Sequence, residues 1–167
     1  MPDAVIAPDI DETPERDENP RLYAQRIARL KCAGVIRPGS FVLSADTVVA
    51  AGRRALPKAD TEATARTCLE LLSGRRHRVL TCVVLRAPDG RTAERVSESA
   101  VTFARLSPGQ LDVYLQSGEW MGKAGGYAVQ GLAAAYVRAL SGSYSGVVGL
   151  PLFETTQLLR GLGYPVP

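Results

Sequence analysis

Two glycine-rich segments near the C-terminal end of the chain constrain its backbone more than any other feature of the sequence. They cover residues 122–131 and 141–152 and contain seven glycines. Glycine has no Cβ, so it allows turns that other residues resist and lets the main chain approach a ligand closely. Lys123 and Gln130 add a cation and an amide to the first segment. The combination predicts a site that binds a polyanion.

The length and composition indicate one soluble domain over residues 1–167. A chain of 167 residues, 46% of them hydrophobic, can bury a core without covalent cross-links. No apolar run approaches the roughly 18 residues that span a bilayer, and the acidic start lacks the basic and apolar regions of a signal peptide. The cysteines Cys32, Cys68 and Cys82 are widely spaced and form no C-x-x-C pair, which argues against disulfides and zinc. We therefore expect a cytoplasmic protein with reduced thiols and no membrane partner.

The charges are distributed unevenly, although the formal net charge is only +3. Residues 9–18 contain six acids, whereas Arg75, Arg76 and Arg78 surround the single histidine, His77. The arginine cluster is interpreted as a solvated face, because it lacks the interleaved aromatic residues of a nucleic-acid surface. No stable nucleic-acid partner is expected. His77 is kept out of catalysis, because its arginine neighbours disfavour the protonated form and no serine or cysteine motif points to it.

The hydrophobic periodicity predicts an α/β fold. Apolar residues recur at helical spacing over residues 20–31, 60–73, 107–117 and 151–162. Runs rich in β-branched residues predict a strand over residues 41–51 and a hairpin of residues 79–85 and 92–105, with a bend or bulge in its second arm. These elements do not alternate with a strict βαβ period, so we expect a mixed sheet rather than a purely parallel one.

Two charged residues lie in apolar surroundings. Asp46 interrupts the buried run of residues 41–51. A carboxylate there is costly to desolvate, so it finds a cation, a metal or several hydrogen bonds, or else it caps a turn with Thr47. Lys31 follows Ile27 by four residues in the predicted helix, which places it near the buried stripe. It either has an anionic partner or reaches a cleft, or it lies at a helix end with its ammonium group extended to solvent.

Six polar residues have the chemistry needed to hydrolyse a phosphoanhydride. That reaction needs cations against the phosphates, a metal held by carboxylates, and a group that activates water. The two carboxylates, three amines and one amide belong to Glu12, Lys31, Asp46, Lys58, Lys123 and Gln130. Each lies in or beside a glycine-rich, apolar or turn context. The set matches the reaction if these side chains converge in the fold.

Five segments of the chain resemble successive motifs of the Maf-type nucleoside triphosphate pyrophosphatases. They are residues 9–12, 44–49, 72–79, 122–131 and 141–152, in the order of that family and spread over almost the whole chain. The Lys-Ala-Gly-Gly-Tyr segment with its following Gln-Gly pair is the most specific of them. The resemblance implies an elongated, mixed and twisted α/β sheet flanked by helices, with two lobes, a central cleft and a homodimeric assembly.

The resemblance also implies a reaction. Family members hydrolyse a nucleoside triphosphate between the α and β phosphates, which yields the monophosphate and pyrophosphate, with Mg²⁺ or Mn²⁺ as cofactor. Asp46 matches the catalytic proton acceptor, and Glu12 matches a second acid that positions metal or water. Both are therefore expected as catalytic residues and metal ligands. Lys31, Lys58 and Lys123 match lysines that face the phosphates.

The implied substrates are dTTP and UTP, together with modified pyrimidine nucleotides. Thr47 and Gln130 match positions tied to selection of the base. Members that favour dTTP and UTP carry Lys-Ala-Gly-x-Tyr-x-x-Gln, as this chain does over residues 123–130, whereas those acting on 7-methyl-GTP have an acid in place of the amide. An amide can both donate to and accept from the edge of thymine or uracil.

The start of the chain departs from the family pattern. Family members have a strand and a Ser-x-x-Arg-Arg-like turn before the Asp-Ile-Asp-Glu motif, whereas eight residues precede Asp9 here. We therefore expect a Maf-like domain that lacks its first strand and its phosphate-binding turn. A lost arginine weakens binding of a triphosphate, which keeps a second hypothesis open: a catalytically weak nucleotide-binding or division-related regulatory protein. Metal-dependent turnover distinguishes the two.

Overall fold

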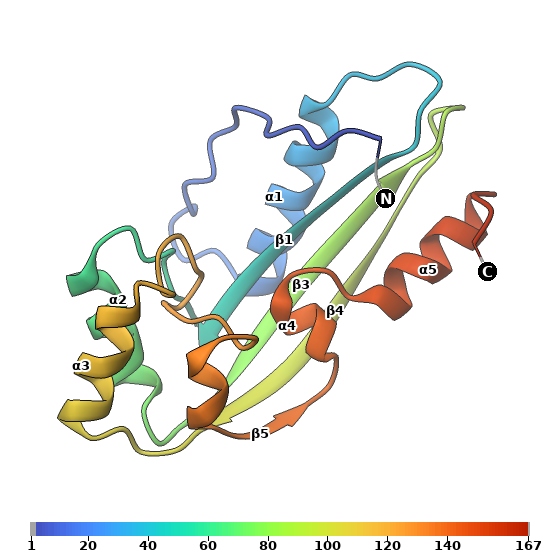
Figure 1. Cartoon of the computed structure of the whole chain (residues 1–167). Helices are drawn as coiled ribbons and strands as arrows, with labels where there is room; N and C mark the ends of the chain where they lie inside the picture. The colour runs from blue at the N-terminus through green and yellow to red at the C-terminus, as the bar shows by residue number, and fades with distance from the viewer. Residues whose placement is uncertain (1–2, 167) are drawn as a thin grey trace.

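The centre of the molecule is a five-stranded sheet, seen in a computed structural model that describes residues 3–166 (Figure 1). The strand order is β2-β1-β3-β4-β5. The strands are β1 (Val42–Ala51), β2 (Arg54–Ala55), β3 (Arg76–Arg86), β4 (Thr92–Phe103) and β5 (Val137–Ser141). Three long neighbouring strands, β1, β3 and β4, give the sheet its elongated shape.

Every pairing between the described strands is antiparallel. The predicted α/β class is confirmed, but the sheet is antiparallel where a mixed sheet was predicted. The connections explain the difference, because short turns join β1 to β2 and β3 to β4 and return the chain in the opposite direction. β3 then pairs with β1 along most of its length, from Val42 opposite Arg86 to Ala50 opposite Arg78.

The predicted hairpin is confirmed as β3 and β4. Gly90 lies in its turn with a φ of 89°, a conformation that favours glycine, and donates its N–H to Ala87 O at 3.0 Å. The register of β4 with β5 shifts between Thr102 and Phe103, but the residue skipped in the pairing is Arg138 of β5, so the irregularity lies beside the second arm of the hairpin rather than as an extra residue within it. A turn signal in the local sequence was sufficient to identify this unit.

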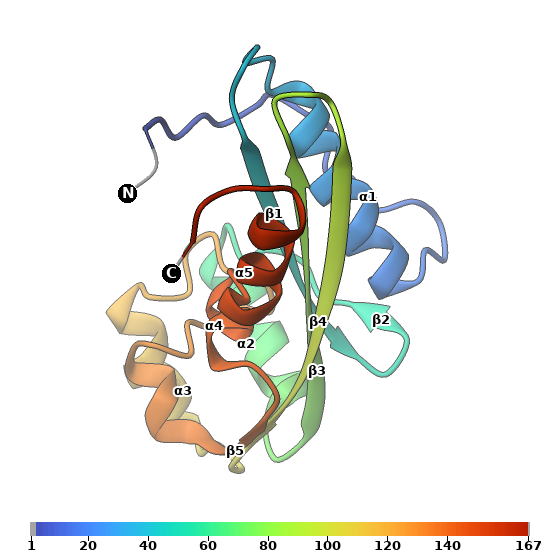
Figure 2. The same cartoon turned by 90° about the vertical axis from the view of Figure 1, so that its right-hand side faces the viewer.

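Helix α1 (Pro20–Gly34) covers one face of the sheet (Figure 2). It begins at the predicted residue, because Asn19 Oδ1 accepts a hydrogen bond from Arg21 N at 2.9 Å and Pro20 lies in the first turn, where its missing N–H costs nothing. The helix extends beyond its predicted end. Its buried face includes the small residue Ala24, which lets α1 lie close to the sheet.

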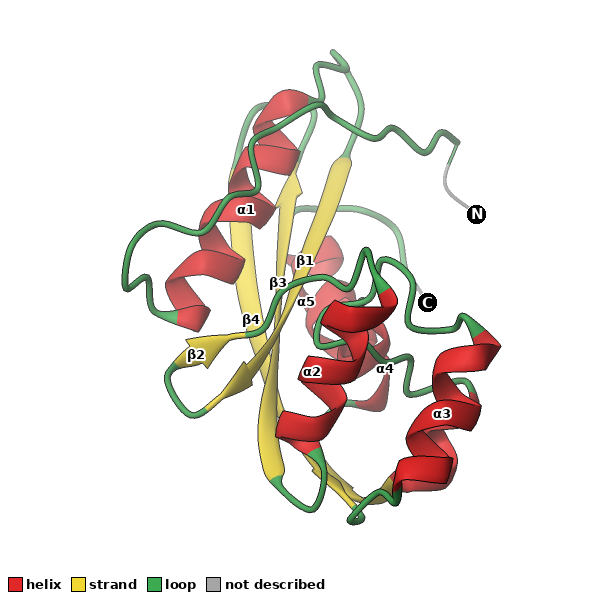
Figure 3. Cartoon of the chain, turned by 90° about the vertical axis from the view of Figure 1, so that its left-hand side faces the viewer, coloured by secondary structure: helices red, strands yellow, loops and turns green. Residues whose placement is uncertain are grey.

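The other helices lie on the opposite side of the sheet from α1 (Figure 3). They are α2 (Glu62–Leu72), α3 (Pro108–Ser117), α4 (Tyr144–Val148) and α5 (Leu152–Gly161). α2, α3 and α5 fall within predicted segments. The sequence did not predict α4 or β5, because five-residue elements are too short to show a period. None of the described helices is long and apolar enough to span a membrane.

The side chains of β1 point alternately into two separate cores. Val42 and Val48 pack in a cluster with α1. Val49 packs in a second cluster, formed with α2 and α3 on the opposite side. Because side chains alternate along a strand, Asp46 shares the α1 face with Val48, whereas Thr47 shares the opposite face with Val49.

The outer edge of β1 is only partly paired. β2 pairs with Ala50 and Ala51 alone, so residues 42–49 have no described strand on that side. Two loop segments approach this edge, one following β2 and one formed by residues 122–131. The candidate site lies where these segments meet β1.

Candidate active site

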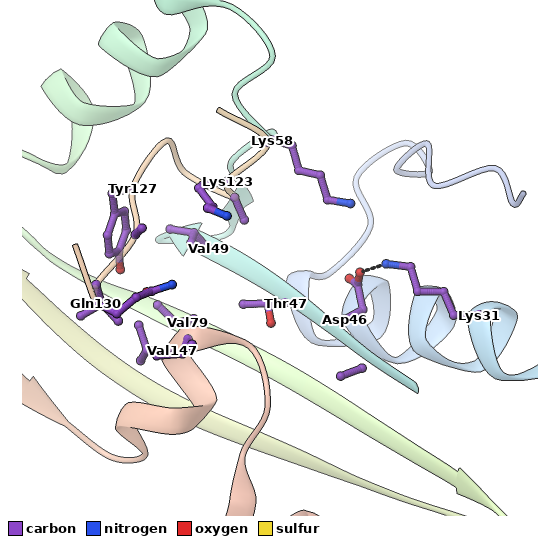
Figure 4. Close-up of a pocket in the computed structure, with 16 residues that line it drawn as sticks. Lys31, Asp46, Thr47, Val49, Lys58, Val79, Lys123, Tyr127, Gln130 and Val147 are labelled. Carbon is purple, nitrogen blue, oxygen red and sulfur yellow. Dashed lines mark hydrogen bonds and ion pairs between the residues drawn. The ribbon is translucent and has the colours of Figure 1, made fainter. Parts of the chain in front are cut away.

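A cavity of about 230 Å³ lies beside this edge of β1 (Figure 4). Six of the seven site residues predicted from the sequence line it, and the seventh, Glu12, is ion-paired to two of them. The six come from α1, β1, the segment after β2 and the loop of residues 122–131. They are Lys31, Asp46, Thr47, Lys58, Lys123 and Gln130.

A chain of ion pairs lies at one end of the cavity. Lys31 Nζ is 2.6 Å from Asp46 Oδ1 and 3.0 Å from Glu12 Oε1. Lys58 Nζ donates a hydrogen bond to Glu12 Oε2. Asp46 therefore has a cation partner instead of capping a turn with Thr47. Lys31 has the anionic partner expected of a lysine near the buried stripe of its helix.

The two carboxyl groups differ in their surroundings. Asp46 is only 6% exposed, and burial raises its pKa, a shift that Lys31 opposes without cancelling. Glu12 is less buried; burial acts to raise its pKa too, but hydrogen bonds from Lys58 and Lys31 outweigh it, and the pKa is lowered. Asp46 is therefore the better proton acceptor of the two, while Glu12 stays ionised.

The contacts with Asp46 and Glu12 also keep Lys31 protonated. Burial by itself would lower the pKa of this amine, but the hydrogen bonds and charges of Asp46 and Glu12 raise it above its ordinary value. Lys31 therefore remains an ammonium group between two carboxylates. A positive charge at this position can face a phosphate group as well as the two acids.

Contacts with α1 fix the extended segment that carries Glu12. Tyr23 Oη donates a hydrogen bond to Glu12 O at 2.8 Å. Arg26 donates to Thr13 O at 3.0 Å and forms a salt bridge of 2.8 Å with Glu18. The acidic stretch near the start of the chain is thus held along the helix, and Glu12 is directed toward the lysines.

Backbone hydrogen bonds attach the loop of residues 122–131 to the segment that carries Lys58. Gly122 N donates to Ala59 O at 2.9 Å, and Ala59 N donates to Lys123 O at 3.0 Å. A β-bridge involving Lys58 continues this short ladder. Lys58 and Lys123 are therefore held at neighbouring positions, and both line the cavity.

Two glycines allow this loop to lie against β1 and α2. Gly125 has a φ of 66°, and a Cβ added there would lie 2.8 Å from Val49 Cγ1. Gly126 has a φ of 73°, and a Cβ added there would lie 3.1 Å from Ala65 Cα. Gly125 thus approaches Val49, which lines the cavity, and Gly126 approaches α2.

Away from Lys31, Asp46 and Lys58, the only charged residue of the described chain that lines this cavity is Lys123. Tyr127, Gln130, Val79 and Val147 line it (Figure 4). The Tyr127 hydroxyl is 2.8 Å from His77 Nε2, which fixes the ring against the core. Apolar side chains beside a single amide suit a flat, neutral group that forms hydrogen bonds along its edge.

His77 belongs to the core behind the cavity. The side chain is 2% exposed, and burial lowers its pKa to about 4. Its ring packs edge-on against Phe103 and Tyr127, with centroids 5.3 and 5.5 Å away. The imidazole is therefore neutral at neutral pH. The flanking residues Arg75 and Arg76 are exposed, as the solvated-face interpretation of the arginine cluster expected.

Thr47 lies between the two ends of the cavity and contacts a residue that the sequence had not singled out. The hydroxyl oxygens of Thr47 and Thr81 are 2.9 Å apart. Thr81 in turn donates a hydrogen bond to Gly146 O at 2.7 Å. The available signal for Thr81 was a hydroxyl group within the apolar run of residues 79–85.

The whole chain is similar to known proteins of one family. The profile of the Maf-like protein family matches residues 1–162. The chain belongs to this family. Proteins named dTTP/UTP pyrophosphatase in Granulibacter bethesdensis and Caulobacter vibrioides are 60% and 61% identical to this Maf-like chain over 180 and 165 residues. The alignments cover 98% of the chain in both cases, and 84% and 86% of the two relatives.

The donor atoms of the Maf-like site suit a divalent cation that also binds phosphate. Within residues 3–166, no group of three or more His, Cys, Asp and Glu side chains is placed to hold a metal. The carboxylates of Asp46 and Glu12 nevertheless converge, since both contact Lys31 Nζ. Mg²⁺ is commonly held by one or two carboxylates, with substrate phosphates and water completing its coordination. Two carboxylates beside a cluster of lysines fit that arrangement.

Proposed function

We propose that this Maf-like protein is a nucleoside triphosphate pyrophosphatase that hydrolyses dTTP and UTP to the monophosphate and pyrophosphate. The observation that carries the proposal is one cavity with lysines and a buried carboxylate toward one end, and an amide and apolar side chains toward the other. A pyrimidine nucleoside triphosphate has the same division between a polyanion and a neutral base. The names of the relatives support these substrates.

The lysines supply the positive charge that a triphosphate requires. Lys31 and Lys58 lie on either side of Glu12, and Lys123 faces the cavity from the glycine-rich loop. Cations fixed in place before the substrate binds need little reorganisation as negative charge develops on the departing pyrophosphate. The three amines therefore both bind the substrate and stabilise the transition state.

Asp46 is the proton acceptor in this proposal. Water attacks the phosphoanhydride between the α and β phosphates, the bridging P–O bond breaks, and pyrophosphate leaves with the bonding electrons. The proton of the attacking water passes to the Asp46 carboxylate, whose raised pKa favours its uptake. Lys31, at 2.6 Å, holds this carboxylate in place.

Asp46 and Glu12 are also the proposed ligands of Mg²⁺ or Mn²⁺. Such a cation, when bound with substrate, neutralises phosphate charge and helps to orient water. The lowered pKa of Glu12 keeps this carboxylate ionised and able to bind a cation. The support for this assignment is the convergence of the two carboxylates on one point.

Thr47 and Gln130 are the proposed contacts to the base. The Gln130 amide can donate to a ring carbonyl of uracil or thymine, which leaves the neighbouring ring N–H for Thr47. Val79 and Val147 provide apolar contacts for the faces of the ring. Pyrimidines modified at a position that leaves this edge intact are expected to be accepted as well.

We further propose that the chain acts as one domain over residues 1–167 and as a cytoplasmic homodimer. Cys32, Cys68 and Cys82 are all buried and free, as expected for a protein of a reducing compartment. Leu152 and Phe153 at the start of α5 are 58% and 72% exposed, which is compatible with a contact between subunits.

The proposed reaction is tested by measuring pyrophosphate release in the presence of Mg²⁺ or Mn²⁺. The substrates compared are dTTP, UTP, CTP, GTP and 7-methyl-GTP. We expect rapid release from dTTP and UTP, little from the other nucleotides, and none from the Asp46→Asn variant. If the folded protein binds dTTP or UTP but releases no pyrophosphate, the enzyme assignment is wrong. That result would favour a nucleotide-binding or regulatory protein instead.

A further inference from the structure

Three oxygen atoms form a chain behind the cavity, from Thr47 through Thr81 to helix α4. The hydroxyl oxygens of Thr47 and Thr81 are 2.9 Å apart, and Thr81 Oγ1 is 2.7 Å from the main-chain oxygen of Gly146. Thr81 lies directly opposite Thr47 in the pairing of β1 with β3. Thr81 is 1% exposed, so bulk water does not compete for these hydrogen bonds.

The direction of the hydrogen bonds is fixed at the Gly146 end. A carbonyl oxygen only accepts, so Thr81 donates its single hydroxyl hydrogen to Gly146. Thr81 can then offer only a lone pair to Thr47, which must donate its own hydrogen to Thr81. The hydroxyl hydrogen of Thr47 is therefore directed toward Thr81. The lone pairs of the Thr47 hydroxyl oxygen face the cavity.

Helix α4 makes this direction difficult to reverse. The helix has only five residues, and Gly146 O has no helical N–H to accept from among the described residues, so it depends on Thr81. Turning the Thr81 hydroxyl toward Thr47 would leave a buried carbonyl unpaired, at a cost large enough to keep the reversed arrangement rare.

Discrimination between bases requires a group whose role as donor or acceptor is fixed, because the Gln130 amide can take either role. An amide can rotate by half a turn about its last side-chain bond and exchange its donor and acceptor. Gln130 could therefore pair with the carbonyl of uracil in one orientation and with the exocyclic amine of cytosine in the other. The amide alone does not distinguish the two bases.

On the basis of the proposed function, we propose that Thr81 is a positioning residue that makes Thr47 an obligatory acceptor, and that this acceptor selects uracil and thymine over cytosine. Ring nitrogen N3 carries a hydrogen in uracil and thymine but a lone pair in cytosine. N3 of the first two bases donates to Thr47. N3 of cytosine points its lone pair at the lone pairs of the Thr47 hydroxyl oxygen. The two acceptors repel each other, so cytosine binds poorly.

Steady-state kinetics with UTP and CTP test the role of Thr81. In Thr81→Val the Thr47 hydroxyl loses its acceptor and can turn its hydrogen into the cavity, so we expect the UTP/CTP ratio of kcat/KM to fall about tenfold or more. The Thr81→Ser variant keeps the hydroxyl and should keep the ratio. In a Thr47→Val background the further change Thr81→Val should not alter the ratio, because Thr81 acts through Thr47.

A second measurement needs no variant. The wild-type enzyme should use 5-methyl-UTP, which keeps the N3 hydrogen, at least about tenfold better than 3-methyl-UTP, which lacks it. Equal use of the two analogues would overturn the inference even if Thr81→Val failed to fold. The two analogues have the same composition, so the comparison tests whether the N3 position of the base faces a close acceptor.

The outcomes separate this inference from the proposed function. If the wild-type protein hydrolyses UTP but Thr81→Val keeps the wild-type UTP/CTP ratio, Thr81 has only a structural role and this inference is wrong, while the pyrophosphatase assignment stands. If the folded wild-type protein hydrolyses neither dTTP nor UTP, both are wrong. A lowered ratio in Thr81→Val that Thr81→Ser restores would support both.

Discussion

Replacing His77 with phenylalanine is expected to remove most of the acid sensitivity of the core behind the cavity. His77 is 2% exposed, and its ring lies edge-on to Phe103 and Tyr127. Phenylalanine preserves this aromatic packing but removes the partner of the Tyr127 hydroxyl, which lies 2.8 Å from His77 Nε2. At neutral pH the variant should therefore be less stable by about 1–3 kcal/mol, the cost of a buried hydroxyl without a partner.

The pH dependence follows from the pKa of His77. Burial lowers this pKa from 6.5 to about 4 in the folded chain. Well above pH 6.5 the imidazole is neutral in both states and contributes no pH dependence. As the pH falls from 6.5 toward 4, the unfolded chain binds a proton that the folded chain excludes, so the free energy of unfolding decreases. A slope near 1.4 kcal/mol per pH unit gives a loss of roughly 3 kcal/mol at pH 4.

The decrease in the free energy of unfolding can be measured by urea denaturation. The wild-type protein and His77→Phe are compared from about pH 7.5 to about pH 4. Carboxyl groups titrate in both proteins, so their contribution cancels in the difference between the two free energies of unfolding. The advantage of the wild type at neutral pH should shrink by about 3 kcal/mol and disappear or reverse in acid. A difference that stays constant with pH would refute the reasoning, because it would mean that folded His77 takes up its proton as readily as the unfolded chain.

Three further predictions concern the site. Asp46→Asn should lower kcat at least about 100-fold by removing the proton acceptor, with an unchanged far-UV circular dichroism spectrum; near-normal kcat would exclude Asp46 from proton transfer. Gly125→Ala should lower the free energy of unfolding by about 2 kcal/mol or more, because its Cβ would meet Val49 at a positive φ. The control Gly109→Ala meets no atom within 4 Å and should be neutral or slightly stabilising, so equal losses in the two variants would contradict the packing argument. Chelation by EDTA should stop pyrophosphate release without unfolding the protein, and Mg²⁺ should restore it; release that persists in EDTA would remove the metal from the proposal.

Features that depend on neighbouring residues could be predicted from the sequence. Lys31 lies four residues after Ile27, and this spacing alone places it near the buried stripe of α1, where it contacts Asp46. The β3–β4 hairpin was identified because its turn signal is local. The expectation that Asp46 needs a partner also rested on local context, since a charge within a buried strand must be compensated.

Features that depend on distant pairings could not be predicted in the same way. The antiparallel pairing of β1 with β3 is set across α2, so no local signal gives its direction. Thr81 acquires its role only because this register places it opposite Thr47 and beneath α4. The burial of His77 was not predicted: strand alternation turns its side chain inward while Arg76 remains exposed, as expected for the arginine cluster. In each case the tertiary arrangement, rather than the residue type, decides the environment.

The position of the cavity at the edge of β1 explains how two consecutive residues can have different tasks. Asp46 points to the α1 face and pairs with Lys31, whereas Thr47 points to the opposite face and bonds to Thr81. In the interior of a sheet, side chains on opposite faces are separated by the backbone and by neighbouring strands. At this edge the cavity is lined by both residues. The proposed proton acceptor and the proposed contact to the nucleobase are adjacent residues, so any shift of β1 that misplaces the nucleobase should also misplace the proton acceptor. This coupling predicts that variants which disturb the β1–β3 register lower kcat and substrate selectivity together, whereas Thr81→Val should change selectivity far more than kcat for UTP.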